Sequence, residues 1–239
     1  MKISIISLFP EVFPAYLNSS ILERAQKKGL VELEYIDLRQ FGKGIHRSVD
    51  DCPFGGGKGQ LLQCEPVLKA IRTIRTEDSR LIMLAPSGRL FKQTIAHELA
   101  QCSHIILLCG HYEGFDYRIE EYCDDILSIG DYVLSGGELA AMVISDAVIR
   151  LLKGAISDGS IKEESFEDGL LEYPQYTKPA IFEDKEVPFV LRNGNHAKIK
   201  EYRIEQALLR TKKMRPDLYR KYQLEKNKGD KNGTKIRKK

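Results

Sequence analysis

Short apolar runs alternate with amphipathic segments, and this pattern constrains the fold more than any other feature of the chain. Residues 3–8 (ISIISL), 80–84 (RLIML) and 104–108 (HIILL) are largely apolar stretches of strand length. Strands that are apolar on both faces are typical of parallel sheets covered by helices on both sides. The pattern therefore predicts an α/β protein with a mostly parallel sheet and helices on both of its faces.

The remaining elements follow from periodicity and from helix start and stop signals. The expected strands and helices are strands at 31–38 and 125–128 and helices at 11–28, 65–75, 92–100, 137–152, 196–210 and 216–225. Residues 137–152 are apolar all round, which predicts a buried helix. Residues 153–175 are polar, acidic and glycine-bearing, which is typical of a connection. We predict a domain at 1–160, a linker at 161–175, a small helical domain at 176–225 and a basic disordered tail at 226–239.

Charge is distributed unevenly along the chain. From His196 to Lys239 there are sixteen Lys and Arg against five Asp and Glu, a balance of +11. Because the whole chain carries only +3, residues 1–195 carry −8. A basic end on an acidic body is expected of a protein that contacts a polyanion at that end.

The cysteine pattern and the hydropathy exclude several classes of protein. Five scattered cysteines form no CxxC pair, so neither a disulfide framework nor a zinc site is expected. Free thiols fit a reducing compartment, and we expect the protein to be cytoplasmic. No run of about 18 apolar residues is present, so no membrane contact is expected. The five histidines show no metal-ligand spacing.

Three glycine-bearing loops follow predicted strands, namely 85–89 (APSGR), 109–116 (CGHYEGFD) and 129–138 (IGDYVLSGGE). In open parallel sheets, ligands bind outside the carboxyl ends of the strands. Glycine allows the backbone to approach a ligand closely. Each loop alone is an ordinary turn, but three loops at one edge of a sheet predict a small-molecule pocket.

The fingerprints of the common nucleotide-binding enzymes are missing. No GxGxxG opens a helix after the first strand, and Gly55 to Gly59 (GGGKG) is followed by Gln60 where a phosphate loop has Ser or Thr. These absences argue against a dinucleotide enzyme or an ATPase of the ordinary doubly wound type.

Five motifs occur in the order GHYEGFD, SIGDYVLSGGE, EYPQYTKP, GNHAKI and RPDL. Together they resemble the bacterial tRNA (guanine-N(1))-methyltransferase family, from SLFPE near the start to about Tyr222. The resemblance implies a SPOUT-superfamily domain with a deep trefoil knot, a feature that sequence reasoning alone would not propose. It also implies S-adenosylmethionine as the methyl donor, tRNA guanosine 37 as the target, and a homodimer whose active site is shared between subunits. Magnesium dependence is a further family expectation, which no residue pattern here supports.

The family motifs also imply which residues hold the cosubstrate. The expected cosubstrate-binding residues are Pro86, Gly110, Tyr112, Glu113, Gly114, Ile129, Gly130, Asp131, Tyr132, Val133, Leu134, Gly136 and Gly137. Methylation of guanine N(1) further requires a base to remove its proton and a cation or donor to stabilise charge on O6. The resemblance assigns the oxygen contact to Arg150.

The family's base is an aspartate just before Ser-Phe, and this chain has Glu164 at that position. Glutamate transfers a proton as well as aspartate does, but its carboxylate lies one methylene further out. A misplacement of about 1 Å can cost on the order of a hundredfold in rate. Glu164 is the predicted base, with Glu163 and Asp168 as the alternatives. A second departure is His111, where the family often has arginine.

Contacts with tRNA are expected from two segments. The predicted contact residues are His46, Arg47, Asp50, Lys198, Arg203, Arg210, Lys212, Lys213 and Arg215. Two alternatives to the guanine-N(1) activity stay open. One is a knotted methyltransferase that acts on a ribose 2′-hydroxyl, and the other is a tRNA-binding protein with weak catalysis.

Overall fold

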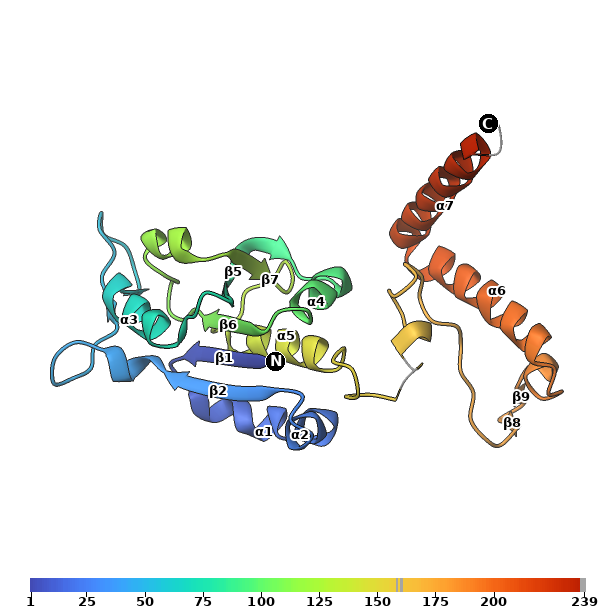
Figure 1. The fold of residues 1–239 in the computed structure, drawn as a ribbon, viewed down its shortest axis with the longest axis horizontal. Coiled ribbons are helices and arrows are strands. Elements are labelled where there is room, and N and C mark those ends of the chain that lie inside the picture. The colour runs from blue at the N-terminus through green and yellow to red at the C-terminus, as the bar shows by residue number, and fades with distance from the viewer. Residues whose placement is uncertain (158, 160, 237–239) are drawn as a thin grey trace. The chain divides into compact units, whose positions relative to one another are not determined.

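The computed structural model describes residues 1–157, 159 and 161–236, with the side chains of 162 and 228–236 left out. The chain divides into two compact units, Met1–Asp158 and Gly159–Lys239. Figure 1 shows the first unit as a sheet between helices and the second as helices with long connections.

A five-stranded parallel sheet organises the first unit. Its strands are β1 (Lys2–Ser7), β2 (Glu32–Asp37), β5 (Ser79–Leu90), β6 (His104–Cys109) and β7 (Asp125–Ser128). Their order is β2-β1-β6-β5-β7, and each neighbouring pair is parallel. The predicted α/β class with a mostly parallel sheet is therefore confirmed.

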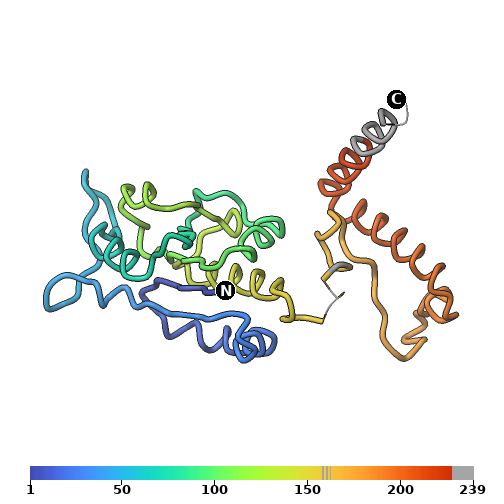
Figure 2. Tube along the Cα trace, in the orientation of Figure 1, coloured from blue at the N-terminus to red at the C-terminus, as the bar shows by residue number. Residues whose placement is uncertain are grey.

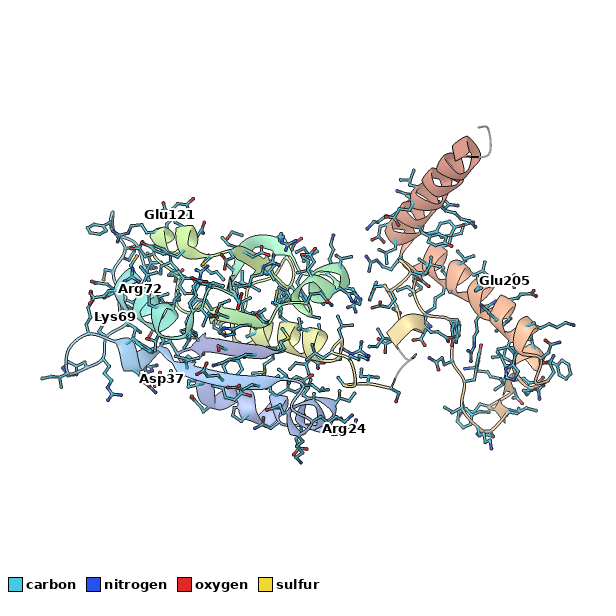
Figure 3. The ribbon with its side chains drawn as sticks, in the orientation of Figure 1. Arg24, Asp37, Lys69, Arg72, Glu121 and Glu205 are labelled. Carbon is cyan, nitrogen blue, oxygen red and sulfur yellow. The ribbon has the colours of Figure 1, made fainter. Side chains whose placement is uncertain are left out.

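Alternate residues of each central strand pack on opposite faces of the sheet. On one face, Ile3 and Leu107 join a core with α1 (Phe13–Leu17), α2 (Ser20–Lys27), α4 (Gln93–Leu99) and α5 (Glu138–Ile149). On the other face, Ile6 and Leu108 pack with α3 (Cys64–Ile74) and the short helix η3 (Tyr117–Tyr122). The Cα trace in Figure 2 follows the same layers. Because both faces are covered, the strands read as continuous apolar runs in the sequence.

The strand β5 differs from the predicted strand at 80–84 because it continues to Leu90. Its register against β7 shifts between Leu84 and Arg89, both of which pair with Leu127. The chain bulges outward between these two points. Gly88 lies in the bulge, where an added Cβ would come within 2.5 Å of the carbonyl carbon of Ile126. Only glycine lets the two backbones pass this closely.

The predicted helix at 11–28 is wrong as a single element. The structure has the short helix η1 (Pro10–Val12), then α1 and α2, with a break at Asn18 and Ser19. The hydroxyl of Ser19 donates to the Tyr16 carbonyl at 2.6 Å. Short polar side chains that bond to nearby backbone compete with a continuous helix. The predicted end at Gly29 is confirmed, because this residue has a φ of +69° after α2.

The helix α5, predicted to be buried all round, has one exposed apolar stripe. Ile144 and Val148 are fully buried, whereas Leu139 and Val143 are 55% and 47% exposed. Leu139 and Val143 are four residues apart, so they lie on the same side of the helix. This side has no cover in the described residues of the chain.

The second unit is built on α6 (His196–Met214) and α7 (Pro216–Ile236). Asn195 caps α6 by accepting from the Lys198 amide at 3.1 Å, and Pro216 opens α7. Two short helices, η4 (Ile161–Glu163) and η5 (Phe189–Leu191), lie in the connections. A hairpin of β8 (Ile181–Phe182) and β9 (Lys185–Glu186) was not predicted. The bounds of α7 run beyond residue 225, and most of the predicted tail at 226–239 lies outside the described side chains.

Candidate small-molecule pocket and catalytic residues

The three predicted loops open onto one edge of the sheet. They follow Leu84, Cys109 and Ser128 on β5, β6 and β7, which are neighbours and run in the same direction. A cavity of about 500 Å³ lies there, within the size range of small-molecule sites. All three loops contribute to its lining. The short pair β3 (Asp50–Asp51) and β4 (Leu61–Leu62) leads into the neighbouring wall.

Twelve of the thirteen residues predicted to bind the cosubstrate line this cavity. They are Pro86, Gly110, Tyr112, Glu113, Gly114, Ile129, Gly130, Tyr132, Val133, Leu134, Gly136 and Gly137. Asp131 is the thirteenth, and it does not line the cavity. Asp131 was predicted from its place in the family motif, and a motif does not indicate which way an individual loop residue faces.

Glycine backbone forms the floor of the cavity. Gly137 donates its amide to the Gly110 carbonyl at 2.8 Å. A Cβ on Gly137 would lie 2.8 Å from Cys109 Cα and 2.9 Å from the Gly110 nitrogen. A Cβ on Gly136 would lie 2.8 Å from His111 Nδ1. The loops after β6 and β7 therefore pack backbone against backbone, and side chains at these positions would separate them.

The walls combine apolar rings with a few polar groups. Tyr112 and Tyr132 line the cavity while remaining 43% and 55% exposed, so their rings are accessible to a ligand. His111 also lines it, and its Nδ1 is buried without a hydrogen-bond partner in the described structure. A buried imidazole nitrogen without a partner is a place where a ligand could hydrogen-bond.

Sequence reasoning missed several lining residues inside the very loops it identified. Besides His111, they include Ser87, Phe115, Asp116, Ser128 and Ser135. The sequence shows that a residue belongs to one of these loops, but it does not show which way its side chain points. The guanidinium of Arg118, 2.6 Å from Asp116, holds the pKa of that carboxyl well below its usual range. Asp116 therefore keeps its negative charge at the rim.

Arg150, one of the two predicted catalytic residues, does not line this cavity. Arg150 is the C-terminal cap of α5, whereas the cavity meets the other end of this helix at Gly137. A helix of twelve residues spans roughly 18 Å. Glu164 belongs to the second unit, where its amide donates to the Ile161 carbonyl at 3.1 Å.

The segment around Glu164 is attached to α6 rather than being an open connection. The Tyr173 hydroxyl donates to Glu163 Oε2 at 2.7 Å, and Arg203 Nη1 lies 3.4 Å from the same oxygen. The Arg203 guanidinium also lies 4.6 Å from the centre of the Tyr173 ring. The Leu171 amide donates at 2.8 Å to Oγ1 of Thr211, which is fully buried. We refer to Glu163, Tyr173 and Arg203 as the clamp.

The clamp bears on which of Glu163, Glu164 and Asp168 could act as the base. Burial, followed by the bond to Glu163, raises the pKa of Tyr173 to about 12, so its hydroxyl remains a donor at any working pH. The carboxylate of Glu163 is thus held by Tyr173 and Arg203. Asp168 is exposed, and Glu164 is half-buried beside the clamp.

The predicted tRNA contacts differ in their exposure and in their partners. Exposed side chains among them include Lys198, Arg210, Lys212 and Lys213 on α6, and His46 and Arg47 in the loop before β3. Asp50 lies partly buried in β3, paired with Leu62 of β4. Arg203 is held in the clamp, and Arg215 lies 2.6 Å from Asp217. The last two are therefore already paired with carboxylates.

Two further searches of the described residues gave no site. None of the groups of three or more His, Cys, Asp or Glu side chains within this part of the chain is arranged to hold a metal ion. Within the same residues, no helix combines the length and the apolar character needed to cross a membrane.

Fold and cavity together define an α/β protein with a cavity of small-molecule size at the carboxyl edge of a parallel sheet, with glycine backbone in place of a phosphate loop. Residues 1–221 match the family model described as tRNA (Guanine-1)-methyltransferase TrmD. The chain belongs to this family.

Relatives named "tRNA (guanine-N(1)-)-methyltransferase" match almost the whole chain. One from Mycoplasma pneumoniae is 49% identical over 231 residues, covering 97% of this chain and 100% of the relative. One from Dictyoglomus turgidum is 50% identical, covering 94% of this chain and 92% of the relative. One from Ureaplasma urealyticum is 51% identical, covering 93% and 98%.

Proposed function

We propose that the protein methylates N(1) of guanosine 37 in tRNA, with S-adenosylmethionine as the methyl donor. The observation that carries this proposal is the cavity at the carboxyl edge of the sheet, which gathers twelve residues of the family motifs. Family membership over residues 1–221 supports the reaction class.

The cavity fits S-adenosylmethionine in its size and in its lining. Backbone at Gly110, Gly136 and Gly137 forms a cradle that a Cβ would fill, so the amides and carbonyls there can contact a flat purine edge. The rings of Tyr112 and Tyr132 offer apolar walls. The bound donor would supply an electrophilic methyl group on a sulfonium centre.

The chain itself must then manage one proton and one developing charge. Guanine N(1) is protonated at neutral pH, so its lone pair is blocked until a base removes that proton. We assign this step to the Glu164 carboxylate. As the proton leaves, negative charge moves to O6, where the Arg150 guanidinium would stabilise it.

A homodimer with a shared active site is part of this proposal. Two observations support it. Arg150 caps the end of α5 remote from the cavity and does not line it. The stripe of Leu139 and Val143 on α5 is exposed, and neighbouring Tyr16 bonds to Asp146 of the same helix. A second copy of the chain is the cover that this stripe would take, and its linker segment would bring Glu164 to the cavity.

The trefoil knot and the domain plan also remain proposals. The knot is inferred from family membership over residues 1–221. We retain a helical tRNA-binding domain at 176–225, with phosphates meeting exposed lysines of α6. All five cysteines are free thiols, which agrees with a cytoplasmic location.

A labelled-donor assay tests the proposal. The protein would be incubated with donor carrying a labelled methyl group and with tRNA transcripts that have guanosine or adenosine at position 37. We expect label only in the guanosine transcript, recovered as N(1)-methylguanosine after digestion. Recovery of 2′-O-methylguanosine would establish the ribose alternative, and no label at all would favour the weakly catalytic tRNA-binding protein.

A further inference from the structure

The loop of residues 42–60 carries two apolar side chains that nothing in the described structure covers. Phe54 is 102% exposed and Ile45 is 99% exposed. Other exposed phenylalanines, such as Phe182 and Phe189, are 63% and 72% exposed. A single exposed apolar residue needs no explanation. Phe54, however, belongs to a loop whose base is bonded to the cavity wall.

The loop is fixed to the cavity wall at its base. Asp50 and Asp51 pair with Leu62 and Leu61. The Glu113 amide donates to the Gln60 carbonyl at 3.0 Å, and the Leu62 amide donates to the Gly114 carbonyl at 2.9 Å. Because Glu113 and Gly114 line the cavity, the end of the loop at Gln60 lies next to the proposed methyl-transfer site.

Glycines after Phe54 shape the approach to that wall. Gly59 has a φ of +88°, and a Cβ there would overlap the side chain of Glu113, 2.5 Å from Oε1. Gly55 and Gly56 also have positive φ, and a Cβ on either would meet nothing within 4 Å. Gly55 and Gly56, next to Phe54, therefore face open space, whereas Gly59 packs against Glu113 of the cavity wall.

Basic side chains accompany Phe54 in the same loop. His46, Arg47 and Lys58 are exposed. Lys43 is paired with Glu65 at 2.8 Å, and the Asp51 carboxylate accepts from the Cys52 amide at 2.8 Å. An exposed aromatic ring in a loop that also carries exposed cations is a combination with which proteins bind single-stranded nucleic acid, through base stacking and phosphate contacts.

We propose that Phe54 stacks on an unpaired base of the tRNA anticodon loop, next to the guanosine that is methylated. This inference rests on the proposed function. A base whose ring atom is to be methylated must leave its stack, and its neighbours then expose their faces. Aromatic side chains commonly take up such faces in RNA loops. Phe54 is thus a tRNA-positioning residue of the loop, distinct from the basic residues of α6.

The chain contains no tryptophan, which makes the test direct. The Phe54→Trp variant carries one indole, at the proposed stacking position. In the free protein its emission is expected to be that of a water-exposed indole, unchanged by S-adenosylmethionine. Addition of an anticodon stem-loop RNA should quench it, because a stacked base quenches indole fluorescence.

Kinetics of the full-length enzyme provide the second arm. Phe54→Ala and Phe54→Leu should raise the KM for tRNA about tenfold, within the range that stacking of one base contributes. Phe54→Trp should restore the wild-type KM, and the affinity for S-adenosylmethionine should stay unchanged in all three. Ile45→Ala is the matched control, because Ile45 is equally exposed but not aromatic, and its KM should stay within about twofold of the wild type.

Three results would overturn the inference. They are a wild-type KM in Phe54→Ala, an indole that RNA does not quench, and a blue-shifted emission that grows with protein concentration. The last result would mean that a second copy of the chain covers this position. Failure of the proposed function is separate, since the wild-type protein would then form no N(1)-methylguanosine in tRNA whether or not the indole is quenched.

Discussion

The cosubstrate cavity and the segment that carries Glu164 are built in contrasting ways. The cavity is formed by backbone tied into a sheet whose central strands are fully buried, as at Ile106 and Leu107. The Glu164 segment is held to α6 by the clamp, whose members Glu163 and Arg203 have side chains 61% and 41% exposed. The difference teaches that the proposed binding site is part of the folded core, whereas the proposed base depends on surface interactions that contribute little each.

The largest expected effect separates chemistry from binding. Glu164→Gln removes the proton acceptor, so kcat should fall by roughly a hundredfold to ten-thousandfold, the usual range for general base catalysis. The affinity for S-adenosylmethionine should not change, because Glu164 is not part of the loops after β5, β6 and β7 that line the cavity. Single-turnover methyl transfer and calorimetric titration measure the two quantities.

Glu164→Asp is the matched control for that variant, because it keeps the carboxylate and only moves it by one methylene. It should retain most of the rate that the Gln variant loses. Full methylation by Glu164→Gln would remove the base assignment, and loss of donor affinity would show that segment and cavity do not act separately.

Gly137→Ala tests the cavity, the first of the two regions compared. The φ of Gly137 is −82°, so alanine is not strained there, and the penalty comes from its Cβ meeting Cys109 Cα at 2.8 Å and the Gly110 nitrogen at 2.9 Å. Overpacking of this kind typically costs about 1–3 kcal/mol. Expressed in donor binding, that cost corresponds to roughly five- to 150-fold weaker affinity. Calorimetric titration with S-adenosylmethionine measures it.

Gly194→Ala is a suitable comparison, because a Cβ there meets nothing within 4 Å although φ is +72°. It should leave donor affinity unchanged. Donor binding by Gly137→Ala within about twofold of the wild type would mean that the glycine floor of the cavity is not needed.

The clamp is expected to have an intermediate effect. Arg203→Ala removes both the contact with Glu163 and the ring contact with Tyr173, and should lower kcat about tenfold by loosening the segment of Glu164. Tyr173→Phe keeps the ring and loses only the hydroxyl, so a smaller loss is expected. If Arg203 acts by positioning, the salt dependence of the KM for tRNA stays as in the wild type. A weaker salt dependence would instead identify Arg203 as a phosphate contact.

The smallest effects are expected at exposed lysines of α6. Lys212→Ala and Lys213→Ala should each raise the KM for tRNA a few-fold and reduce the slope of log KM against log salt by about one. Arg215→Ala is the control, because Arg215 is already paired with Asp217. Measuring KM over a range of salt concentrations compares the three. Equal slopes in all variants would mean that the phosphate contacts do not lie at this end of α6.

Much of the first unit could be predicted because its signals are local. Apolar runs such as 104–108 identify buried strands, and Gly29 ends a helix where a left-handed residue is needed. The three glycine loops could be assigned to one edge because parallel strands end on the same side. Family motifs then selected twelve lining residues in advance, although they did not exclude Asp131.

Features that depend on distant contacts were not predictable in this way. The continuation of β5 to Leu90 depends on its passage across the backbone of Ile126. The exposed stripe of α5 could not be predicted, because an apolar helix has the same sequence pattern whether the core of its own chain or a partner covers it. Arg203 looked like a phosphate contact until Glu163 and Tyr173 were found beside it.

The sequence by itself determined the α/β class, the parallel sheet, the edge at which the cavity opens and the family. Continuous apolar runs, glycine positions and ordered motifs are written in neighbouring residues. The tertiary structure alone decided which loop residues face the cavity, that Arg150 stands at the far end of α5, and that the segment of Glu164 is clamped to α6. The physical reason is that side-chain direction and contacts between distant segments arise only when the chain packs.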